Sequence, residues 1–151
     1  MKIAIFTDTF YPQVNGVANT LNRFGEYLES ANIDYLFIVP ETQNDMGLPY
    51  NVLSFFSAPF ILYPQCRFTF PNTTILNKHL DGFKPDIILL MTEFNVGLMG
   101  LKYAKSRKIP VVSNYSTNFS TILKSYHLGF FEKILNTYLG LFHNAADHTI
   151  T

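Results

Sequence analysis

The sequence predicts an α/β domain in which helices cover both faces of a parallel β-sheet, as in Rossmann-like folds. Five short runs rich in Ile, Val, Leu and Phe recur along the chain, and they do not alternate apolar with polar residues. Runs of this kind are typical of parallel strands that are buried on both faces. Segments with helical periodicity separate several of them, which is the order of βαβ units. The expected strands are residues 3–6, 35–39, 52–55, 87–91 and 109–112.

The first expected helix covers residues 16–30. Apolar side chains recur there at the spacing of one helix face: Val17, Leu21, Phe24 and Leu28. Asn15 precedes the segment and is a suitable N-cap, because its side chain can accept a hydrogen bond from an N–H group of the first turn. Gly25 lies inside the helix, where glycine costs about 1 kcal/mol relative to alanine. We therefore expect the helix to pass close to the sheet at Gly25.

A second helix is expected over residues 96–107, after the strand at 87–91, and Pro110 separates it from the next strand. Residues 43–71 contain four prolines and many aromatic residues. Such a composition predicts a long ordered excursion with few regular elements beyond the short strand near Val52. This excursion interrupts the βαβ order.

Residues 119–146 return to a helical pattern, which predicts two helices broken near Gly129. Apolar residues surround much of the second helix: Ile134, Leu135, Tyr138, Leu139, Leu141 and Phe142. Such a helix is either clamped between the sheet and another element, or it faces a membrane or a further domain. A further strand begins near Asp147 and the sequence stops there. We therefore expect residues 1–151 to be one domain of a longer protein.

Composition excludes several classes of function. The 11 basic and 11 acidic residues cancel, so no net positive field is available to hold nucleic acid. Cys66 is the single cysteine, which excludes an internal disulfide and a cysteine-based zinc cluster and fits a reducing compartment. The four histidines show no metal-ligand spacing, and we expect most of them to be surface or interface residues. The apolar run at 3–6 is too short for a signal peptide, so we expect a cytoplasmic protein.

The loops after the strands are the candidate site, because ligands of an open parallel sheet bind at the carboxyl ends of its strands. The first loop, residues 7–17, lacks the G-x-G-x-x-G spacing of dinucleotide-binding folds, which disfavours a nicotinamide enzyme. It contains Asn15 and Gly16 at an expected helix start, where N–H groups and the helix dipole favour an anion. An Asn-Gly pair alone is also an ordinary turn. Asp8 is suited to orient this loop or, more ordinarily, to accept hydrogen bonds from backbone N–H groups.

Two later loops carry polar residues at the same edge. Glu93 or Asn95 is suited to cap the helix that follows the strand at 87–91. In the third loop, the hydroxyl of Ser116 can donate a hydrogen bond but does not titrate near neutral pH. Thr117 and Asn118 are suited either to bind a ligand or to cap a following helix. No G-x-S-x-G elbow or P-loop is present, so hydrolase and NTPase functions lose their usual support.

Three segments resemble family 4 retaining glycosyltransferases of the two-domain GT-B fold. They read KIAIFTDTFYPQVNGVANTLNRFGEYL, PDIILLMTEFNVGLMGLKYAKSRKIPVVSNYSTNF and HNAADHTIT. They occur in the family's order and at similar spacing, so the resemblance extends over nearly all of the 151 residues. The resemblance implies one half of a GT-B fold. It also implies transfer of a sugar from a nucleotide-sugar donor to a sugar or lipid acceptor, with retained configuration and without a metal or a cofactor.

The same resemblance implies roles for individual residues. The loop that faces the donor diphosphate comprises Asn15, Gly16 and Val17. The acceptor side comprises Asp8, Glu93, Tyr115, Thr117 and Asn118, with Glu93 placed to accept a hydrogen bond from a sugar hydroxyl. Ser116 is the catalytic candidate, because it stands where relatives have a histidine that touches the donor sugar. Serine can bind a sugar hydroxyl there but cannot replace the imidazole.

The family's second domain holds the donor through two glutamates eight positions apart, and no two glutamates of this sequence have that separation. We therefore expect residues 1–151 to fold but not to transfer sugar alone. A membrane surface is a further expected partner, at the inner face of the membrane. The residues that suggest it are Phe130, Phe131, Tyr138, Leu141, Phe142, Lys124 and Lys133. Two alternatives stay open: a GT-B sugar-nucleotide epimerase, and a non-catalytic module that binds a sugar nucleotide or a protein partner.

Overall fold

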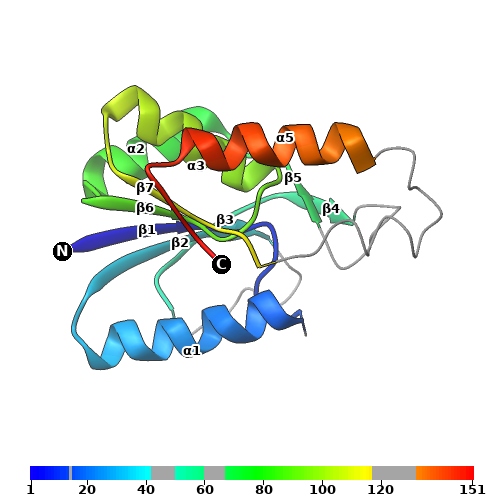
Figure 1. The fold of residues 1–151 in the computed structure, drawn as a ribbon. Coiled ribbons are helices and arrows are strands. Elements are labelled where there is room, and N and C mark those ends of the chain that lie inside the picture. Colours follow the sequence, from blue (N-terminus) through cyan, green and yellow to red (C-terminus); the bar gives the residue numbers. More distant parts are fainter. Residues whose placement is uncertain (14, 42–49, 60–66, 117–131) are drawn as a thin grey trace.

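The fold is a six-stranded parallel sheet with helices on both faces. The computed structural model describes residues 1–13, 15–41, 50–59, 67–116 and 132–151. The strand order is β3-β2-β1-β6-β7-β8, and each neighbouring pair is parallel. One face carries α1, and the other carries α2, α3 and α5 (Figure 1). The prediction of a Rossmann-like α/β fold is confirmed.

Four strands lie where the apolar runs predicted them. They are β1 (Lys2–Phe6), β2 (Asp34–Pro40), β3 (Val52–Phe55) and β6 (Ile87–Leu90). Alternate residues of β1 enter two separate cores, because successive side chains of a strand point to opposite faces. Ala4 and Phe6 pack on the face of α2 and α3, whereas Ile3 and Ile5 pack with Leu21 of α1.

The strand β7 (Val111–Asn114) begins two residues later than expected, and β8 (His148–Ile150) pairs with it as the expected last strand. The delay has a local cause. Lys108 ends the preceding helix in the left-handed conformation, with φ of 57°, and the N–H group of Ile109 still donates to Ala104 O at 3.0 Å. Pro110 then has no N–H group to offer a neighbouring strand.

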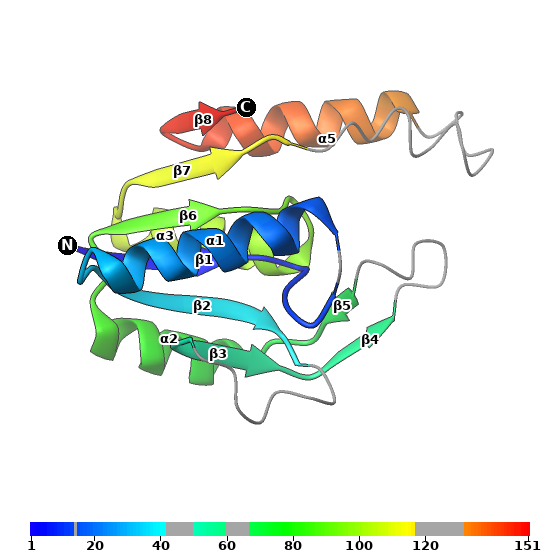
Figure 2. The same ribbon diagram turned by 90° about the horizontal axis from the view of Figure 1, so that it is seen from below.

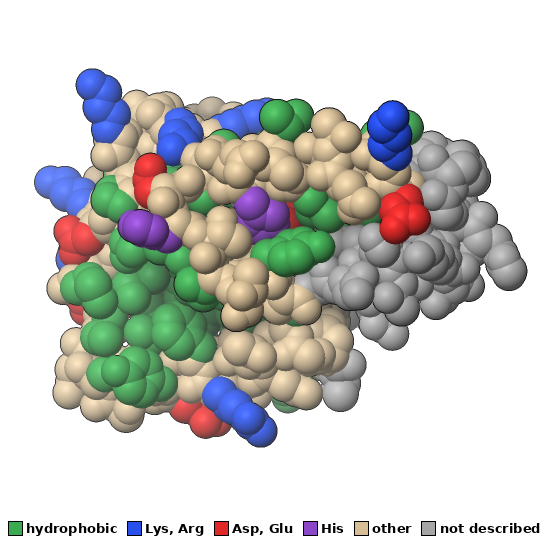
Figure 3. Space-filling view, in the orientation of Figure 1, with side chains coloured by type: hydrophobic (Ala, Val, Ile, Leu, Met, Phe, Trp, Pro, Cys, Tyr) green, Lys and Arg blue, Asp and Glu red, His purple; other side chains and the backbone are tan. Residues whose placement is uncertain are grey.

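The last strand leaves apolar surface on the α1 face of the sheet. Figure 2 shows β8 and α5 along one edge of the sheet, whereas α1 lies over its centre. In Figure 3, which has the orientation of Figure 1, hydrophobic side chains (green) gather on the left, between the positions of β8 and α1. Ile150 of β8 is 50% exposed.

The helix α1 (Gly16–Ser30) has the predicted bounds and the predicted cap. Asn15 Oδ1 accepts a hydrogen bond from Ala18 N at 2.9 Å. The close approach at Gly25 is also present, but the neighbour is not a strand. A Cβ atom at Gly25 would lie 2.6 Å from Cε1 of Tyr50, whose ring packs under the helix just before β3.

The helix α3 (Asn95–Arg107) begins one residue before its predicted start. It approaches the sheet so closely that two positions admit only glycine. A Cβ atom at Gly97 would lie 1.8 Å from Thr92 O, and one at Gly100 would lie 2.6 Å from Cγ of Phe6. Glycine here therefore brings the start of α3 directly against the end of β6.

Three elements were not predicted. The helix α2 (Thr73–Phe83) is capped by Asn72, whose Oδ1 accepts from Thr74 N at 3.0 Å, and it buries Leu76 and Leu80. The short strands β4 (Ser57–Pro59) and β5 (Arg67–Thr69) form an antiparallel pair. They lie within the segment that was expected to contain few regular elements.

The helix α5 (Glu132–Ala145) corresponds to the second helix predicted near the carboxyl end. Leu139 and Phe142 are buried, whereas Ile134 and Leu141 are 67% and 68% exposed. One side of α5 is therefore clamped on the sheet and the other is open. The helix predicted before Gly129 and the thiol of Cys66 lie outside the described residues. No helix within the described ranges has the length and apolar character needed to cross a membrane.

Candidate functional site

The candidate site lies at the carboxyl ends of β1 and β6, where the direction of the chain connections reverses. From β1 the chain passes to β2 on one side, and from β6 it passes to β7 on the other. This is the topological switch point, where ligands of open α/β sheets bind. Met91 N donates to Phe6 O at 2.8 Å, so the loops after β1 and β6 leave the sheet side by side.

The loop after β1 presents an open helix start. Gly16 is exposed, and a Cβ atom placed on it would meet nothing within 4 Å. Asn15 joins the start of α1 to the loop, because its Nδ2 donates to Thr9 Oγ1 at 2.7 Å. The first N–H groups of a helix have no partner inside the helix, so this end of α1 can receive an anion. The predicted loop residues Gly16 and Val17 are the first two of the helix.

Asp8 joins the loop after β1 to the start of α3. It is fully buried, and its Oδ1 accepts a hydrogen bond from Val96 N at 2.9 Å. Its Oδ2 accepts from Thr92 Oγ1 at 2.6 Å and lies 3.5 Å from Gly97 N. Of the two roles considered, Asp8 therefore has the ordinary one of accepting hydrogen bonds from backbone N–H groups.

The expectation that Glu93 or Asn95 caps α3 is wrong. The carboxylate that accepts from the helix N-terminus belongs to Asp8, in the loop after β1. The amide of Asn95 instead exchanges hydrogen bonds with the backbone of Thr69 in β5. Phe94, which precedes the helix, has a hydrocarbon side chain that cannot cap. The cap therefore depends on the tertiary fold and could not be read from local spacing.

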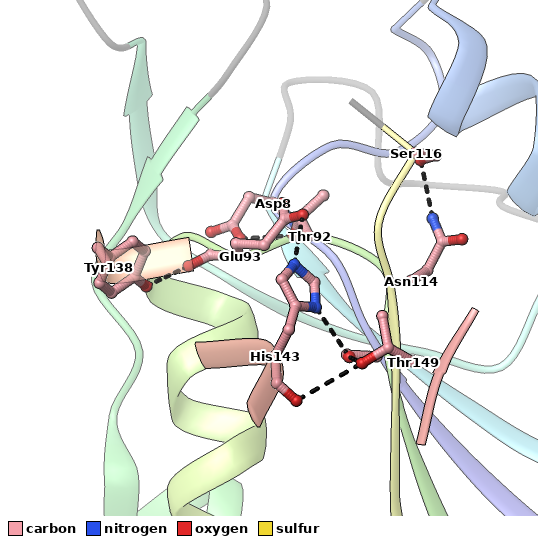
Figure 4. A network of polar contacts seen from close by, with 9 residues as sticks. Asp8, Thr92, Glu93, Asn114, Ser116, Tyr138, His143 and Thr149 are labelled. Atoms are coloured by element: carbon pink, nitrogen blue, oxygen red, sulfur yellow. Dashed lines mark hydrogen bonds and ion pairs between the residues drawn. The ribbon is translucent and has the colours of Figure 1, made fainter. Parts of the chain in front are cut away.

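Glu93 is covered by α5 and is only 2% exposed. Its backbone carbonyl accepts a hydrogen bond from the hydroxyl of Tyr138. Its carboxylate Oε1 lies 3.3 Å from Nε2 of His143, which follows Tyr138 in α5. Figure 4 shows both side chains of α5 converging on Glu93. That Glu93 accepts a hydrogen bond from a sugar hydroxyl stays a prediction, and this carboxyl group already has His143 as a neighbour.

His143 also connects β7 and β8. Its Nδ1 lies 2.9 Å from Ser113 Oγ, which in turn lies 2.9 Å from Thr149 Oγ1. Thr149 Oγ1 donates to the backbone oxygen of His143 at 3.5 Å, so the three residues form a ring of polar contacts. His143 is thus an interface residue of the fold, as expected for most of the histidines, but it lies directly at the candidate site.

The third predicted loop is represented by Tyr115 and Ser116. The ring of Tyr115 packs edge-on against His143, with 5.1 Å between centroids. Ser116 is exposed, and its hydroxyl accepts a hydrogen bond from Asn114 Nδ2 at 2.8 Å. Both lie at the same edge of the sheet as Asp8 and Glu93, as Figure 4 shows for Ser116. Thr117 and Asn118 lie outside the described residues.

Burial shifts the proton affinities of the three ionisable groups at this edge. Burial raises the pKa of Asp8 to about 6, against the opposing effect of the hydrogen bonds from Thr92 and from the N-terminus of α3. Burial raises the pKa of Glu93 to about 7, and the negative charge of Asp8 adds to this shift. Burial lowers the pKa of His143. A carboxyl group and an imidazole in contact thus both favour their neutral forms.

Within the described ranges, no three His, Cys, Asp or Glu side chains are gathered so that they could hold a metal ion. What the site offers is an exposed helix start beside buried, mutually paired polar groups. Such an arrangement can bind an anion at Gly16 and polar hydroxyl groups near Ser116.

Sequence reasoning missed the contribution of α5. The partners Tyr138 and His143 lie 45 and 50 residues from Glu93, and no local spacing reveals such a contact. Tyr138 was counted among the apolar residues of this helix, and His143 was expected, like most of the histidines, to be a surface or interface residue. Ser113 and Thr149 gave no signal beyond their places at the ends of two strands.

Comparison with known proteins gives a consistent result. The family model "Glycosyltransferase Family 4" matches residues 14–151. The alpha-monoglucosyldiacylglycerol synthase of Streptococcus pneumoniae is 32% identical over 79% of this chain and 27% of its own length. A GDP-mannose-dependent alpha-mannosyltransferase of Mycobacterium tuberculosis is 26% identical over 99% of this chain and 41% of its own length.

A solved structure supports the fold. The UDP-GlcNAc 2-epimerase of Methanocaldococcus jannaschii superposes with a TM-score of 0.60 at 16% identity, over 100% of this chain and 39% of the epimerase. This likeness shows the fold alone. The chain spans less than half of each of these three proteins. From the extent of the family match, and from the identity to the synthase, the chain belongs to glycosyltransferase family 4.

Proposed function

We propose that this chain forms the acceptor-side half of a GT-B glycosyltransferase, the rest of which belongs to a longer protein. The reaction is transfer of a sugar from a nucleotide-sugar donor to a lipid or other acceptor, with retained configuration. Membership of family 4 supports the transferase class. One relative is named for a diacylglycerol lipid and another for its dependence on GDP-mannose. These names support a lipid acceptor and a nucleotide-sugar donor.

The observation that carries this proposal is the open start of α1 at the switch point. Gly16 is exposed and has free space around its Cα, and Asn15 fixes the helix start through Ala18 N and Thr9 Oγ1. The N–H groups of Gly16 and Val17 are suited to hold the donor diphosphate. Preorganised dipoles at that place would stabilise the negative charge that develops on the leaving group.

The remaining predicted residues line the same edge in this proposal. Ser116 binds a hydroxyl of the donor sugar at the position of the family's histidine, and it does so without titrating. Tyr115, Thr117 and Asn118 belong to the acceptor side, and Asp8 acts indirectly by holding the start of α3. No metal or cofactor takes part, and the nucleotide-sugar is a substrate. Because one wall of the cleft belongs to the rest of the longer protein, residues 1–151 alone have no transferase activity.

The test is the substitution Gly16→Leu in the full-length protein. A Cβ atom added at Gly16 meets no described atom within 4 Å, so we expect the fold to be retained. Its side chain fills the space that the diphosphate needs, so we expect kcat/KM to fall by about 100-fold or more. Gly82→Leu is the matched control, because Gly82 also lies in a helix with nothing within 4 Å of an added Cβ.

The control variant should keep normal turnover of the nucleotide-sugar. Normal rates in Gly16→Leu would contradict the assignment of this loop to the diphosphate. Nucleotide-sugar binding by the full-length protein without transfer to any acceptor would instead favour the non-catalytic binding module. Interconversion of the free nucleotide-sugar would favour an epimerase.

We further propose a peripheral location at the cytoplasmic face of a membrane. Ile134 and Leu141 are exposed on α5 beside the exposed Lys133, and a partly apolar, partly basic helix face suits a lipid surface. Of the residues that first suggested this contact, Tyr138 and Phe142 face the protein interior instead. Phe130, Phe131 and Lys124 lie outside the described residues. Sedimentation with anionic vesicles at low salt is the direct test, and a chain that stays in the supernatant contradicts it.

A further inference from the structure

A chain of polar side chains runs from the buried Glu93 to the exposed Thr149 in the last strand of the sheet. Glu93 Oε1 meets His143 Nε2 at 3.3 Å, and His143 Nδ1 meets Ser113 Oγ at 2.9 Å. Ser113 Oγ meets Thr149 Oγ1 at 2.9 Å, and Thr149 Oγ1 donates to His143 O at 3.5 Å. The proposed reaction assigns no role to this chain, although it ends in a carboxyl group at the switch point (Figure 4).

Hydrogen counting favours one direction of the chain. Each hydroxyl has one hydrogen to donate. In the arrangement that satisfies every one of these contacts, Thr149 donates to the carbonyl of His143 at 3.5 Å and accepts from Ser113, so the hydrogen of Ser113 is not given to the imidazole. His143 Nδ1 must then carry a hydrogen and donate to Ser113. A neutral imidazole with hydrogen on Nδ1 has a bare Nε2, which requires a donor, and Glu93 faces it.

In this arrangement the pair holds one proton, which can lie on either of two atoms. Either Glu93 is protonated and donates to Nε2, or the proton has moved to Nε2 and the pair is carboxylate and imidazolium. Both forms hold one proton between two groups and have no net charge. The alternative, an ionised Glu93 beside a neutral imidazole, leaves an uncompensated charge on a side chain that is 3% exposed, which is costly.

The groups around the pair favour the neutral forms. Asp8 lies in the neighbouring loop, and its negative charge raises the pKa of Glu93, in addition to the larger effect of burial. Tyr138 of α5 contacts the backbone of Glu93, and the ring of Tyr115 covers one side of His143. Ser113 and Thr149 supply only hydroxyl groups. No described basic side chain is paired with Glu93 besides His143.

We propose that His143 is a positioning residue for Glu93. The two side chains share one proton at neutral pH, so that Glu93 adds no negative charge to the edge where the diphosphate of a nucleotide-sugar binds. The diphosphate ligand rests on the proposed function, whereas the shared proton rests on the contact between Glu93 and His143 and on the burial of Glu93. Asp8 differs from Glu93, because the N-terminus of α3 stabilises its negative charge and opposes the effect of burial.

The first experiment is a pH titration of the full-length protein with 15N-labelled histidine, observed by NMR. The pair loses its shared proton as the pH rises through the midpoint of this titration. We expect His143 to carry a hydrogen on Nδ1 below that midpoint, and to carry its hydrogen on Nε2 above it. Glu93→Gln should abolish this change between about pH 6.5 and pH 8.5, because its amide donates to Nε2 without titrating. His148→Gln identifies the signal of the exposed His148 and should leave the change intact.

Two results would overturn the shared proton. One is a His143 that carries its hydrogen on Nε2 throughout this pH range, and the other is a Glu93→Gln variant that titrates like the parent. Ser113→Ala provides a second variant in case Glu93→Gln does not fold. It removes the acceptor of the Nδ1 hydrogen, so the midpoint of the change should move to lower pH.

The second experiment measures KM for the nucleotide-sugar and kcat against pH. In the parent, KM should rise about five- to tenfold from pH 6.5 to pH 8.5 as Glu93 ionises beside the diphosphate. In Glu93→Gln the rise should be absent. Equal rises in both proteins, with the NMR change present, would overturn the electrostatic role. A parent without transferase activity would contradict the proposed function instead, and the NMR result would still decide the shared proton.

Discussion

The loops after β1 and β6 lie side by side at one edge of the sheet, yet the first is open and the second is sealed. Gly16 is exposed and has room for an added side chain, whereas Gly97 is buried against Thr92 O. Glu93 is covered by two side chains of α5. The open loop offers backbone groups to a ligand, and the sealed loop has already paired its polar groups within the protein.

In the proposed function, the switch point binds the donor with one of its two loops, and the other has a structural role. Buried polar groups that are mutually paired give little direct affinity, but they set the local charge and hold the neighbouring elements. The following substitutions test this division of labour, and each has a control of the same chemistry elsewhere in the chain.

Gly97→Ala should have the largest effect, because it forces α3 away from the sealed loop. The added Cβ atom would lie 1.8 Å from the backbone oxygen of Thr92, which cannot move as a side chain can. We expect the free energy of unfolding to fall by about 4 kcal/mol. Gly82→Ala in α2 is the control and should gain up to about 1 kcal/mol from helix propensity. Urea unfolding of both variants measures the difference, and equal stabilities would mean that α3 does not rest on β6 as described.

Asp8→Ala should have the next largest effect. It leaves the buried N–H group of Val96 and the hydroxyl of Thr92 without their acceptor, which should cost about 3 kcal/mol of unfolding free energy. Asp8→Asn should recover most of the loss, because its carbonyl accepts from Val96 and its amide can donate to Thr92. The exposed Asp34 provides the control, and thermal unfolding of Asp34→Ala should match the parent within about 0.5 kcal/mol. An equal loss in Asp8→Ala and Asp8→Asn would show that the cap is not what Asp8 supplies.

The sealed loop should also make stability depend on pH. Burial raises the pKa of Glu93 from 4.5 to about 7, so the folded state binds the proton more tightly than the unfolded state. This stabilisation is complete below pH 4.5 and is lost as the pH rises through about 7. Relative to Glu93→Gln, the parent should lose about 2 kcal/mol of unfolding free energy between pH 5 and pH 8. Glu26→Gln on the exposed side of α1 is the control, and it should follow the parent at every pH.

Asn15→Ala tests the open loop and should have the smallest effect on stability. It removes the hydrogen bonds to Ala18 N and Thr9 Oγ1, at a cost of about 1 kcal/mol. Asn19→Ala, on the exposed side of the same helix, should instead gain up to about 0.5 kcal/mol. Guanidinium unfolding separates the two variants. If Asn15→Ala lost as much free energy of unfolding as Asp8→Ala, the two loops would not differ as described.

Local patterns were sufficient for most of the fold. The apolar runs marked the strands because parallel strands are buried on both faces, and Asn15 located the start of α1 to the residue. The helix α2 was missed because it follows a proline-rich segment and buries only Leu76 and Leu80. The spacing of these two leucines, with Asn72 before them, was a usable helix signal. Gly25 indicated a close approach but not its partner, since Tyr50 comes from a loop.

The candidate site was less predictable than the fold. The open loop was found because a helix start and its cap are local features. The sealed loop was not, because Asp8 caps a helix 88 residues away and His143 reaches Glu93 across 50 residues. Contacts of this range are set by strand order, which the sequence pattern does not specify by itself.

The double attachment of α5 to Glu93 has a mechanical consequence. Tyr138 and His143 contact the backbone and the side chain of one residue, and Thr149 ties the following strand to the same helix. Any force on α5 therefore acts directly on the end of β6, and through it on the start of α3. A domain that pulled on this helix would move residues of the candidate site without contacting them.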